Sequence, residues 1–261
     1  MKYFFVLLFL GVVINANAQH RYRITALEGG TRYNNEFVRN HPSLSTIQDN
    51  AKMPVSFSGE GYIISSQGFQ QDISSGIYLH LSRFINDTTF NPNRKLRIGI
   101  SGSSAGIGVY GKKQSGNIID TFSEARLSYV HSYNILSLDI ATLHFGKIFW
   151  KRFRPFAGAG ISPGISLNSK GRFSSDTTNS TSFIFNGRRY YDFSISTSDR
   201  EYALKPLIYL SAYIPIGLNF RVSKTLDLNL ESRLNINITH IKTTEFNTGF
   251  SVMLSATYKL F

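Results

Sequence analysis

The chain has 261 residues, no cysteine and a formal net charge of +12 at pH 7. The absence of cysteine excludes disulfide bonds, thiolate metal sites and a cysteine nucleophile. A basic balance is typical of nucleic-acid binding, but the N-terminus described next predicts export, so we expect no nucleic-acid partner. The acidic partners that we expect instead are phosphate groups at a lipid surface.

The N-terminus has the pattern of a cleaved signal peptide. Lys2 gives a short positive region, Phe4 to Ile14 form an apolar core, and Ala16-Asn17-Ala18 is a small-x-small cleavage motif. The apolar core is shorter than the roughly 20 residues that a transmembrane helix needs. We therefore predict that residues 1–18 are removed and that the mature chain begins at Gln19.

Residues 19–261 are predicted to form one domain, of which the first part, 19–72, is poorly assigned. Residues 22–30 and 55–65 compete for the first strand, and neither segment alternates cleanly. Further along, apolar and polar residues alternate in four segments, which we predict to be strands: 73–85, 94–104, 134–146 and 153–168.

The C-terminal part shows the strongest pattern. Three runs, Leu204 to Val222, Leu226 to Thr239 and Thr248 to Phe261, carry apolar residues at nearly every even position. Asp227, Glu231 and other polar residues occupy the odd positions. A period of two residues indicates β-strands, because successive side chains leave opposite faces of the pleat. Strands that are apolar on one side and charged on the other fit a wall between lipid and a wet interior.

The predicted fold is therefore all-β, a transmembrane antiparallel up-and-down β-barrel. One strand from the N-terminal part gives eight strands, the number that we favour. Counting both N-terminal candidates and residues 123–131 gives ten. Both totals are even, as single-chain bacterial barrels require. A soluble lipocalin-like barrel is disfavoured, because it would place the charged residues outside and their apolar neighbours inside.

The connections indicate how the barrel lies in the membrane. Residues 148–152 and 223–225 are short connections on the side of the C-terminus, whereas 170–202 is a long polar segment on the opposite side. Short periplasmic turns and long outer loops are typical of bacterial barrels. We therefore expect both termini in the periplasm and a long outer loop at 170–202. The lipid partners that we expect for the basic residues are then those of the outer membrane, including lipopolysaccharide.

Three stretches carry a resemblance to a known family. They are Leu136 to Ile140 followed by Phe153 to Gly160, Ile214 to Leu230, and the C-terminal Ser255 to Phe261. With these stretches the chain resembles the small outer-membrane β-barrel proteins of Bacteroidota, the broad PorT-like group. The resemblance covers residues 73–261 and departs from the family pattern at Ala141, where a proline is usual. It implies the fold and the Gram-negative outer membrane. It also implies that Phe261 is a terminal signal for the barrel assembly machinery.

The charged residues on the inward faces allow two interpretations. They could line a narrow pore for ions or small solutes, or they could form an ion-pair network that plugs the lumen. Eight strands leave room mainly for side chains, which favours the plug. The residues concerned are Lys95, Arg97, Asp139, Arg221, Asp227, Glu231, Arg233 and Lys259.

Two further groups of residues bear on function. His80 and Ser82 share one strand face, and the pair is similar to the active site of outer-membrane lipid A deacylases. A lipid-modifying enzyme is thus an alternative, but the pair lies on the polar face, away from lipid. No metal or cofactor site is predicted. We expect a non-enzymatic structural or surface-binding barrel, in which Arg172, Arg188 and Arg189 of the outer loop contact anions.

Overall fold

The computed structural model describes residues 22–37, 43–52, 60–86, 89–117, 121–240 and 244–260. The predicted signal peptide and the terminal Phe261 lie outside these residues. The described elements are β1 (Tyr22–Phe37), α2 (Leu44–Asp49), β2 (Ile63–Asn86), β3 (Thr89–Asn117), β4 (Thr121–Phe145), β5 (Phe153–Phe185), β6 (Arg188–Ala203), β7 (Ile208–Arg221), β8 (Leu226–His240) and β9 (Thr244–Lys259).

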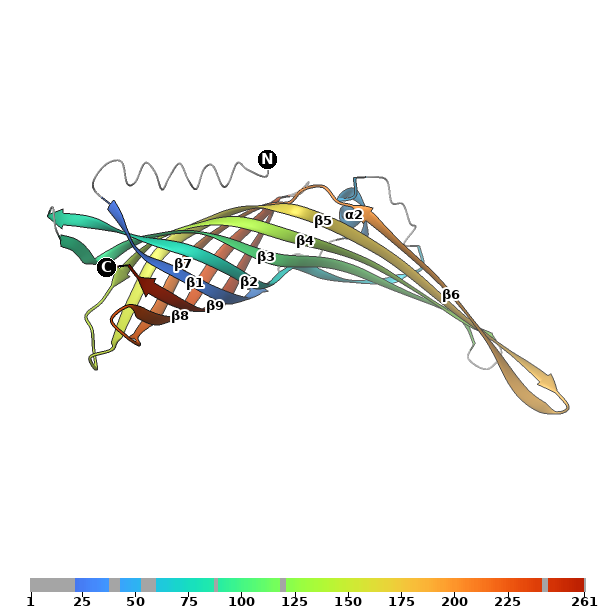
Figure 1. The fold of residues 1–261 in the computed structure, drawn as a ribbon. Helices are drawn as coiled ribbons and strands as arrows, with labels where there is room; N and C mark the ends of the chain where they lie inside the picture. Colours follow the sequence, from blue (N-terminus) through green and yellow to red (C-terminus); the bar gives the residue numbers. More distant parts are fainter. Residues whose placement is uncertain are drawn as a thin grey trace.

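Eight strands close into a barrel (Figure 1). Their order around the ring is β4-β3-β2-β1-β9-β8-β7-β5, and pairing between β4 and β5 closes it. All of these pairs are antiparallel. The ring confirms the predicted all-β barrel with eight strands. The ninth described strand, β6, pairs with β5 alone and lies outside the ring.

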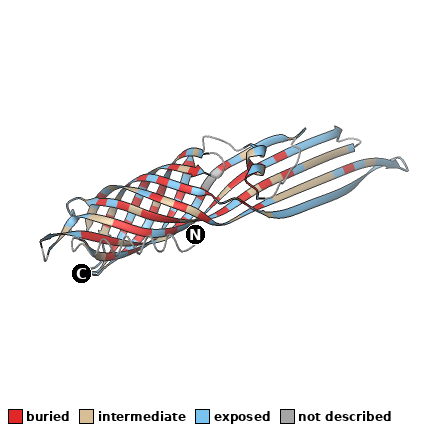
Figure 2. Cartoon of the chain, turned by 90° about the horizontal axis from the view of Figure 1, so that it is seen from above, coloured by how far each residue is buried: buried red, intermediate tan, exposed pale blue. Residues whose placement is uncertain are grey.

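The ring is apolar outside and polar inside, and buried and exposed residues alternate along its strands (Figure 2). Ile214, Leu230 and Leu254 point outward and are 52%, 54% and 64% exposed, whereas Glu231 and Arg233 point inward and are fully buried. A soluble barrel has the opposite arrangement, and an apolar outer surface is the one that suits lipid. Among the described residues, no helix is long and apolar enough to cross a lipid bilayer.

The N-terminal half corrects two of our expectations. The first strand is Tyr22–Phe37, longer than the candidate 22–30, and it pairs with both β2 and β9. Of the rival candidate 55–65, residues 63–65 begin β2, and residues 55–59 lie outside the described residues. Residues 123–131 are the outer part of β4 rather than an extra strand.

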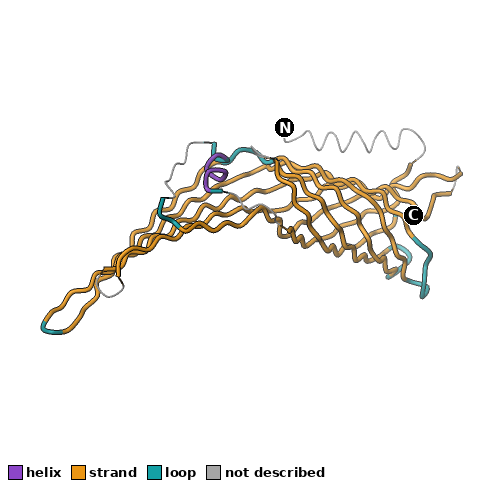
Figure 3. Tube along the Cα trace, turned by 180° about the vertical axis from the view of Figure 1, so that it is seen from behind, coloured by secondary structure: helices purple, strands orange, loops and turns teal. Residues whose placement is uncertain are grey.

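Four strands, β2 to β5, continue far beyond the ring on one side (Figure 3). Pairing between β1 and β2 ends at Tyr33 and Ile73, whereas β2 goes on to pair with β3 as far as Ile63. We call the outer parts of these strands the sheet extension. It comprises residues 63–71 of β2, 105–117 of β3, 121–133 of β4, 170–185 of β5, and β6. This five-stranded sheet curves away from the barrel axis (Figure 1).

The prediction of a long outer loop at 170–202 is wrong. These residues form the hairpin of β5 and β6, in register from Lys170 opposite Ala203 to Phe185 opposite Arg188. The turn is Asn186-Gly187, and both residues have positive φ angles, 51° and 71°. A two-residue turn of this kind matches the twist of the paired strands, and Asn-Gly favours it.

The strand predicted at 204–222 also begins later than expected. β7 starts at Ile208, and residues 204–207 form the connection from β6 back to the ring. Leu204, which the pattern placed towards lipid, is buried there together with Leu207. The apolar residues at even positions therefore continue through residues 204–207, although this segment is not part of the barrel wall.

Candidate functional site

A network of charged side chains fills the middle of the barrel. Arg97 forms a bidentate ion pair with Glu231, with N–O distances of 2.6 and 3.0 Å. Arg233 contacts the same carboxylate through Nε at 2.5 Å and reaches Asp139 through Nη1 at 3.0 Å. All four side chains are at most 1% exposed. Alternating positive and negative groups thus cross the lumen.

Residues from the N-terminal half extend this network. Arg32 lies 3.8 Å from Asp139, and Glu28 lies 3.7 Å from Arg97. Glu28 also contacts His80 Nε2 at 2.5 Å. We call this set the lumen network; its members are Arg32, Asp139, Arg233, Glu231, Arg97, Glu28 and His80. Its three arginines balance its three carboxylates, so each buried charge has an opposite partner, as low-dielectric interiors require.

Aromatic rings hold the network in place. The Tyr213 hydroxyl donates to Asp139 at 2.5 Å, and the Arg233 guanidinium lies 4.3 Å from the centre of the Tyr213 ring. Gly160 makes room for that ring, because a Cβ at this position would lie 2.4 Å from Tyr213. The inward glycine of β5 thus allows a bulky side chain on β7 to cross the lumen.

Of the eight residues predicted to point into the lumen, four form this central network: Arg97, Asp139, Glu231 and Arg233. The other four lie near the inner end, where β1 begins and β9 ends. Lys259 contacts Asp227 at 2.6 Å, Lys95 is partly buried, and Arg221 is exposed at the end of β7. Sequence analysis missed Glu28 and Arg32, which belong to the poorly assigned segment, although both lie on the inward face of β1.

His80 and Ser82 do not form a nucleophilic pair. His80 contacts Glu28, while the Ser82 hydroxyl lies 3.1 Å from the hydroxyl of Thr25. Both side chains are 3% exposed and lie inside the barrel. A serine nucleophile needs a histidine within hydrogen-bond reach, so this geometry gives no support to the enzyme alternative.

The outer mouth of the lumen is covered by an apolar cluster. Tyr209 links the two regions, because its hydroxyl donates to Asn237 inside the barrel at 3.1 Å while its ring belongs to the cluster. The helix α2, in the connection between β1 and β2, contributes Ile47 to this cluster, and Ile47 is fully buried. The cluster's buried members are Ile47, Ala105, Ile107, Val109, Leu127, Tyr129, Tyr133, Ile135, Leu204, Leu207 and Tyr209.

The segment that contains α2, residues 43–52, is capped at its start and bound to the rest of the chain after the helix. Ser43 caps α2 by accepting a hydrogen bond from the Thr46 amide at 3.1 Å. After the helix, the Lys52 amide donates to Ala203 O at 2.9 Å, and the Lys205 amide donates to Asn50 O at 2.9 Å. The connection between β1 and β2 is therefore bound to the connection between β6 and β7.

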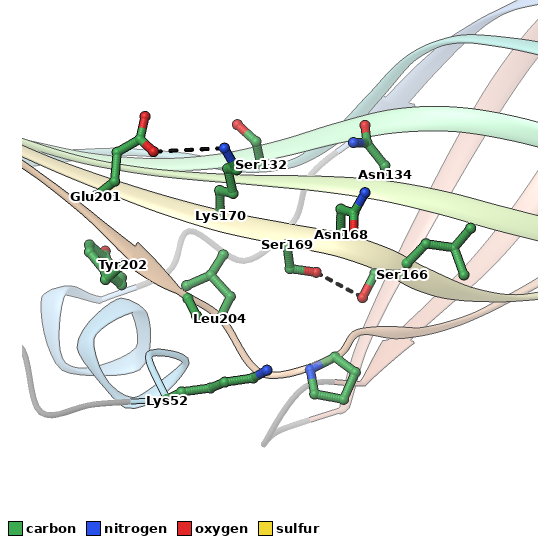
Figure 4. Close-up of a pocket in the computed structure, with 13 residues that line it drawn as sticks. Lys52, Ser132, Asn134, Ser166, Asn168, Ser169, Lys170, Glu201, Tyr202 and Leu204 are labelled. Atoms are coloured by element: carbon green, nitrogen blue, oxygen red, sulfur yellow. Dashed lines mark hydrogen bonds and ion pairs between the residues drawn. The ribbon is translucent and has the colours of Figure 1, made fainter. Parts of the chain in front are cut away.

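A polar groove lies at the outer rim, where β5 changes partner from β7 to β6 (Figure 4). Its volume is about 800 Å³. Lys170 and Glu201 form an ion pair of 3.8 Å at one end, and Ser169 donates to Ser166 at 2.9 Å at the other. The polar side chains that line this outer groove are Lys52, Ser132, Asn134, Ser166, Asn168, Ser169, Lys170, Glu201 and Tyr202.

The three arginines predicted to bind anions lie on the hairpin of β5 and β6. Arg172 forms an ion pair with Asp199, with Nε 3.0 Å from both carboxylate oxygens. Hydrogen bonding from Arg172 holds the pKa of Asp199 below its usual range. Arg188 and Arg189 are exposed at the start of β6. The guanidinium of Arg172 is thus already engaged by a carboxylate of the same chain.

The described residues contain no group of three or more His, Cys, Asp or Glu side chains placed to hold a metal ion. The arrangement that they do show is a closed antiparallel ring, apolar outside and charged inside. This is the β-barrel class found in outer membranes.

No family model matches the sequence, and no curated protein is similar to it. Among solved structures, Neisserial surface protein A is similar at 11% identity and a TM-score of 0.36, over 92% of this chain and 99% of that chain. Ail, the attachment invasion locus protein of Yersinia pestis, was solved with the heparin analogue sucrose octasulfate. It is 10% identical, with a TM-score of 0.33, over 90% and 97% of the two chains.

The outer membrane protease OmpT from Escherichia coli is also similar, at 8% identity and a TM-score of 0.17, over 92% and 95% of the two chains. At these TM-scores the likeness assigns no site and no activity to this chain. The fold is given by its own strand pairings. Membership of the PorT-like group of Bacteroidota stays a prediction.

Proposed function

We propose that this chain is a non-enzymatic protein of the Gram-negative outer membrane that binds a polar ligand at the cell surface. The barrel is its closed anchor and the sheet extension is its binding element. One observation carries the proposal. Four ring strands continue outward into a sheet with its own apolar core, while paired charges fill the lumen that they leave behind.

The lengths of the connections support the orientation. The described turn 222–225 is at the inner end, with the first residue of β1 and the last of β9, and 146–152 is there too. The sheet extension and α2 are at the opposite end. Because bacterial barrels have short periplasmic turns and long outer segments, we assign the extension to the cell surface. Cleavage of residues 1–18 and recognition of Phe261 by the assembly machinery belong to the same proposal.

The outer groove is the ligand site that we propose. Its amide and hydroxyl groups suit a polyhydroxylated ligand, and Lys52 and Lys170 suit phosphate. It also lies directly beyond the apolar outer surface of the ring, since Asn134 in the groove is followed two residues later on the same face by Leu136. A groove at this level is placed to hold the head of an outer-leaflet glycolipid, so we name lipopolysaccharide as the ligand.

A narrow pore is the alternative that the lumen geometry disfavours. An ion would have to break the pairs among Arg97, Glu231, Arg233 and Asp139, whose charges are already balanced. It would also have to pass the apolar cluster around Ile47 at the outer mouth. Both barriers lie on the same axis, so we expect no stable conductance.

Two measurements test the proposal. In planar lipid bilayers the refolded protein is expected to be electrically silent, and stable conductance steps would refute the closed anchor. In detergent, the protein is expected to bind purified lipopolysaccharide. Asn134→Ala combined with Asn168→Ala should weaken this binding by roughly tenfold, because two hydrogen bonds are lost. Ser194→Ala combined with Thr197→Ala, on exposed β6, is the matched control. Equal affinity of both double variants would remove the groove from the proposal.

A further inference from the structure

The inner end of the barrel holds a cavity of about 310 Å³ that no function described above uses. Six basic side chains line it: Lys95, Arg152, Arg154, Arg221, Lys224 and Lys259. Each comes from a different segment, namely β3, the turn between β4 and β5, β5, β7, the turn between β7 and β8, and β9. The fold thus brings together six positive charges from distant parts of the sequence.

Backbone contacts hold these segments against one another. The Arg221 amide donates to Arg152 O at 2.9 Å, which joins the end of β7 to the turn before β5. The Lys259 amide donates to Thr225 O at 2.7 Å, which joins β9 to the turn that carries Lys224. The cavity wall is therefore built from hydrogen-bonded segments rather than from loose loops.

One arginine is also fixed through its side chain. Arg154 donates to Gly146 O at 3.0 Å, to Pro92 O at 2.9 Å and to Asn93 Oδ1 at 2.6 Å. All three acceptors are neutral. The guanidinium therefore keeps its full positive charge while its position is fixed, as preorganised anion sites require.

The positive charge of the cavity is not balanced within its lining. Asp227 is the only acidic side chain among the lining residues, and it is bonded to Lys259 at 2.6 Å and to Asn219 at 3.1 Å. The lumen network a short way along the same axis has equal numbers of arginines and carboxylates. Like charges held close together repel one another, so an anion from outside the chain would stabilise the inner cavity.

We propose that this inner cavity binds a phosphate-bearing anion. Phosphate presents several acceptor oxygens and more than one negative charge, which matches a ring of Lys and Arg donors. Phe145 and Ile148 line the same cavity and give it an apolar flank. The phosphate could come from a phospholipid headgroup of the adjacent leaflet or from a soluble phosphorylated compound. The site is at the opposite end of the barrel from the outer groove, so its test does not depend on the proposed surface function.

Calorimetric titration of the protein, folded in a phosphate-free detergent, with inorganic pyrophosphate tests the proposal. Wild type is expected to bind. Arg221→Gln combined with Lys224→Gln should weaken binding by roughly tenfold or more, because charge-assisted hydrogen bonds are lost. The matched control is Arg188→Gln combined with Lys112→Gln, which removes the same charge from the sheet extension. No binding by wild type, or equal weakening in both double variants, would overturn the proposal.

A variant with the opposite expected sign excludes simple unfolding as the cause. Asp227→Asn removes the carboxylate found among the described lining residues and frees Lys259, so pyrophosphate should bind severalfold more tightly. Unchanged or weaker binding by a folded Asp227→Asn protein would contradict the site.

Reconstitution separates the two sources of phosphate. The titration is repeated in vesicles of phosphatidylglycerol and in vesicles of a phosphate-free galactolipid. Loss of pyrophosphate binding in phosphatidylglycerol alone identifies a lipid headgroup as the occupant. Binding that persists in both vesicles identifies a soluble phosphorylated compound.

Discussion

The two halves of β4 have the same alternation but opposite polarity. Inside the ring, Asp139 points inward and Leu136 points outward. In the sheet extension, Tyr129 and Tyr133 point inward and are fully buried, and Asn134, directly after the extension, points outward and is exposed. A strand that passes from lipid to water must exchange the polarity of its two faces, because the apolar side always avoids water. The exchange between residues 134 and 136 therefore marks the outer boundary of the lipid-facing surface.

The two regions are also stabilised by different forces. The ring has no free strand edge, and the charges of its lumen network are paired with one another. The sheet extension is an open sheet whose concave face is covered by α2 and the segment 204–207. The ring should therefore respond to changes of buried charge, and the extension to changes of buried apolar volume.

The largest effect is expected from Arg233→Met. This change leaves Glu231 and Asp139 buried without their shared partner, and breaking a buried ion pair costs about 3–5 kcal/mol. Unfolding by urea in lipid vesicles, followed by the fluorescence of the single tryptophan Trp150, measures the loss. Arg188→Met on exposed β6 is the control and should change the free energy of unfolding by less than about 0.5 kcal/mol. Equal stability of the two variants would mean that the lumen network contributes nothing to the ring.

The second-largest effect tests whether the sheet extension unfolds independently of the ring. Leu207→Ala removes a fully buried side chain from the apolar cluster, and such truncations cost about 2–5 kcal/mol. Amide hydrogen exchange should accelerate in β6 and α2, while the Trp150 unfolding midpoint of the ring stays the same. Leu210→Ala, outward on β7, is the control and should leave exchange in the extension unchanged. A matching fall in ring stability for Leu207→Ala would show that the two regions unfold as one unit.

The polarity exchange also explains which elements could be predicted from the sequence. Strands such as β8 lie wholly within the ring, and their apolar and charged faces gave a clear period of two. The hairpin of β5 and β6 has water on both faces of its outer part, so Ser, Thr and Asp occur on both and no period is visible. The signal that could have identified this hairpin is local, the Asn186-Gly187 turn.

The site was predictable only in part, for a related reason. Alternation shows that Arg97 and Glu231 both point inward, but not that they meet. They are separated by 134 positions in the chain and come from β3 and β8, which do not pair. Their contact depends on the stagger of all eight strands, and stagger is set by the closed ring. Of the basic residues of the inner cavity, Lys95, Arg221 and Lys259 were among the residues predicted to point inward. Arg152, Arg154 and Lys224 escaped notice because they lie in or beside turns.

The smallest expected effect is a pH dependence confined to the sheet extension. His131 lies on the concave face, with Nε2 2.7 Å from the Tyr202 hydroxyl and Nδ1 3.5 Å from that of Tyr133. Burial lowers the pKa of His131 to about 4, below the unfolded value of 6.5. The unfolded chain therefore binds more protons between these values, so the extension loses stability as pH falls from 6.5 towards 4. At about pH 5 this amounts to at most about 2 kcal/mol.

Hydrogen exchange at about pH 7.5 and about pH 5, corrected for the intrinsic rate, measures this loss. Protection in β4 and β6 beyond the ring should fall at the lower pH, and His131→Phe should remove most of the fall, because phenylalanine keeps the ring volume and binds no proton. His240→Gln, at the exposed end of β8, is the control and should leave the fall intact. A fall of the same size in the ring strands β8 and β9 would assign the pH dependence to the carboxylates of the lumen network. In that case the ring would be the acid-sensitive region, and the extension would lose protection only because the ring does.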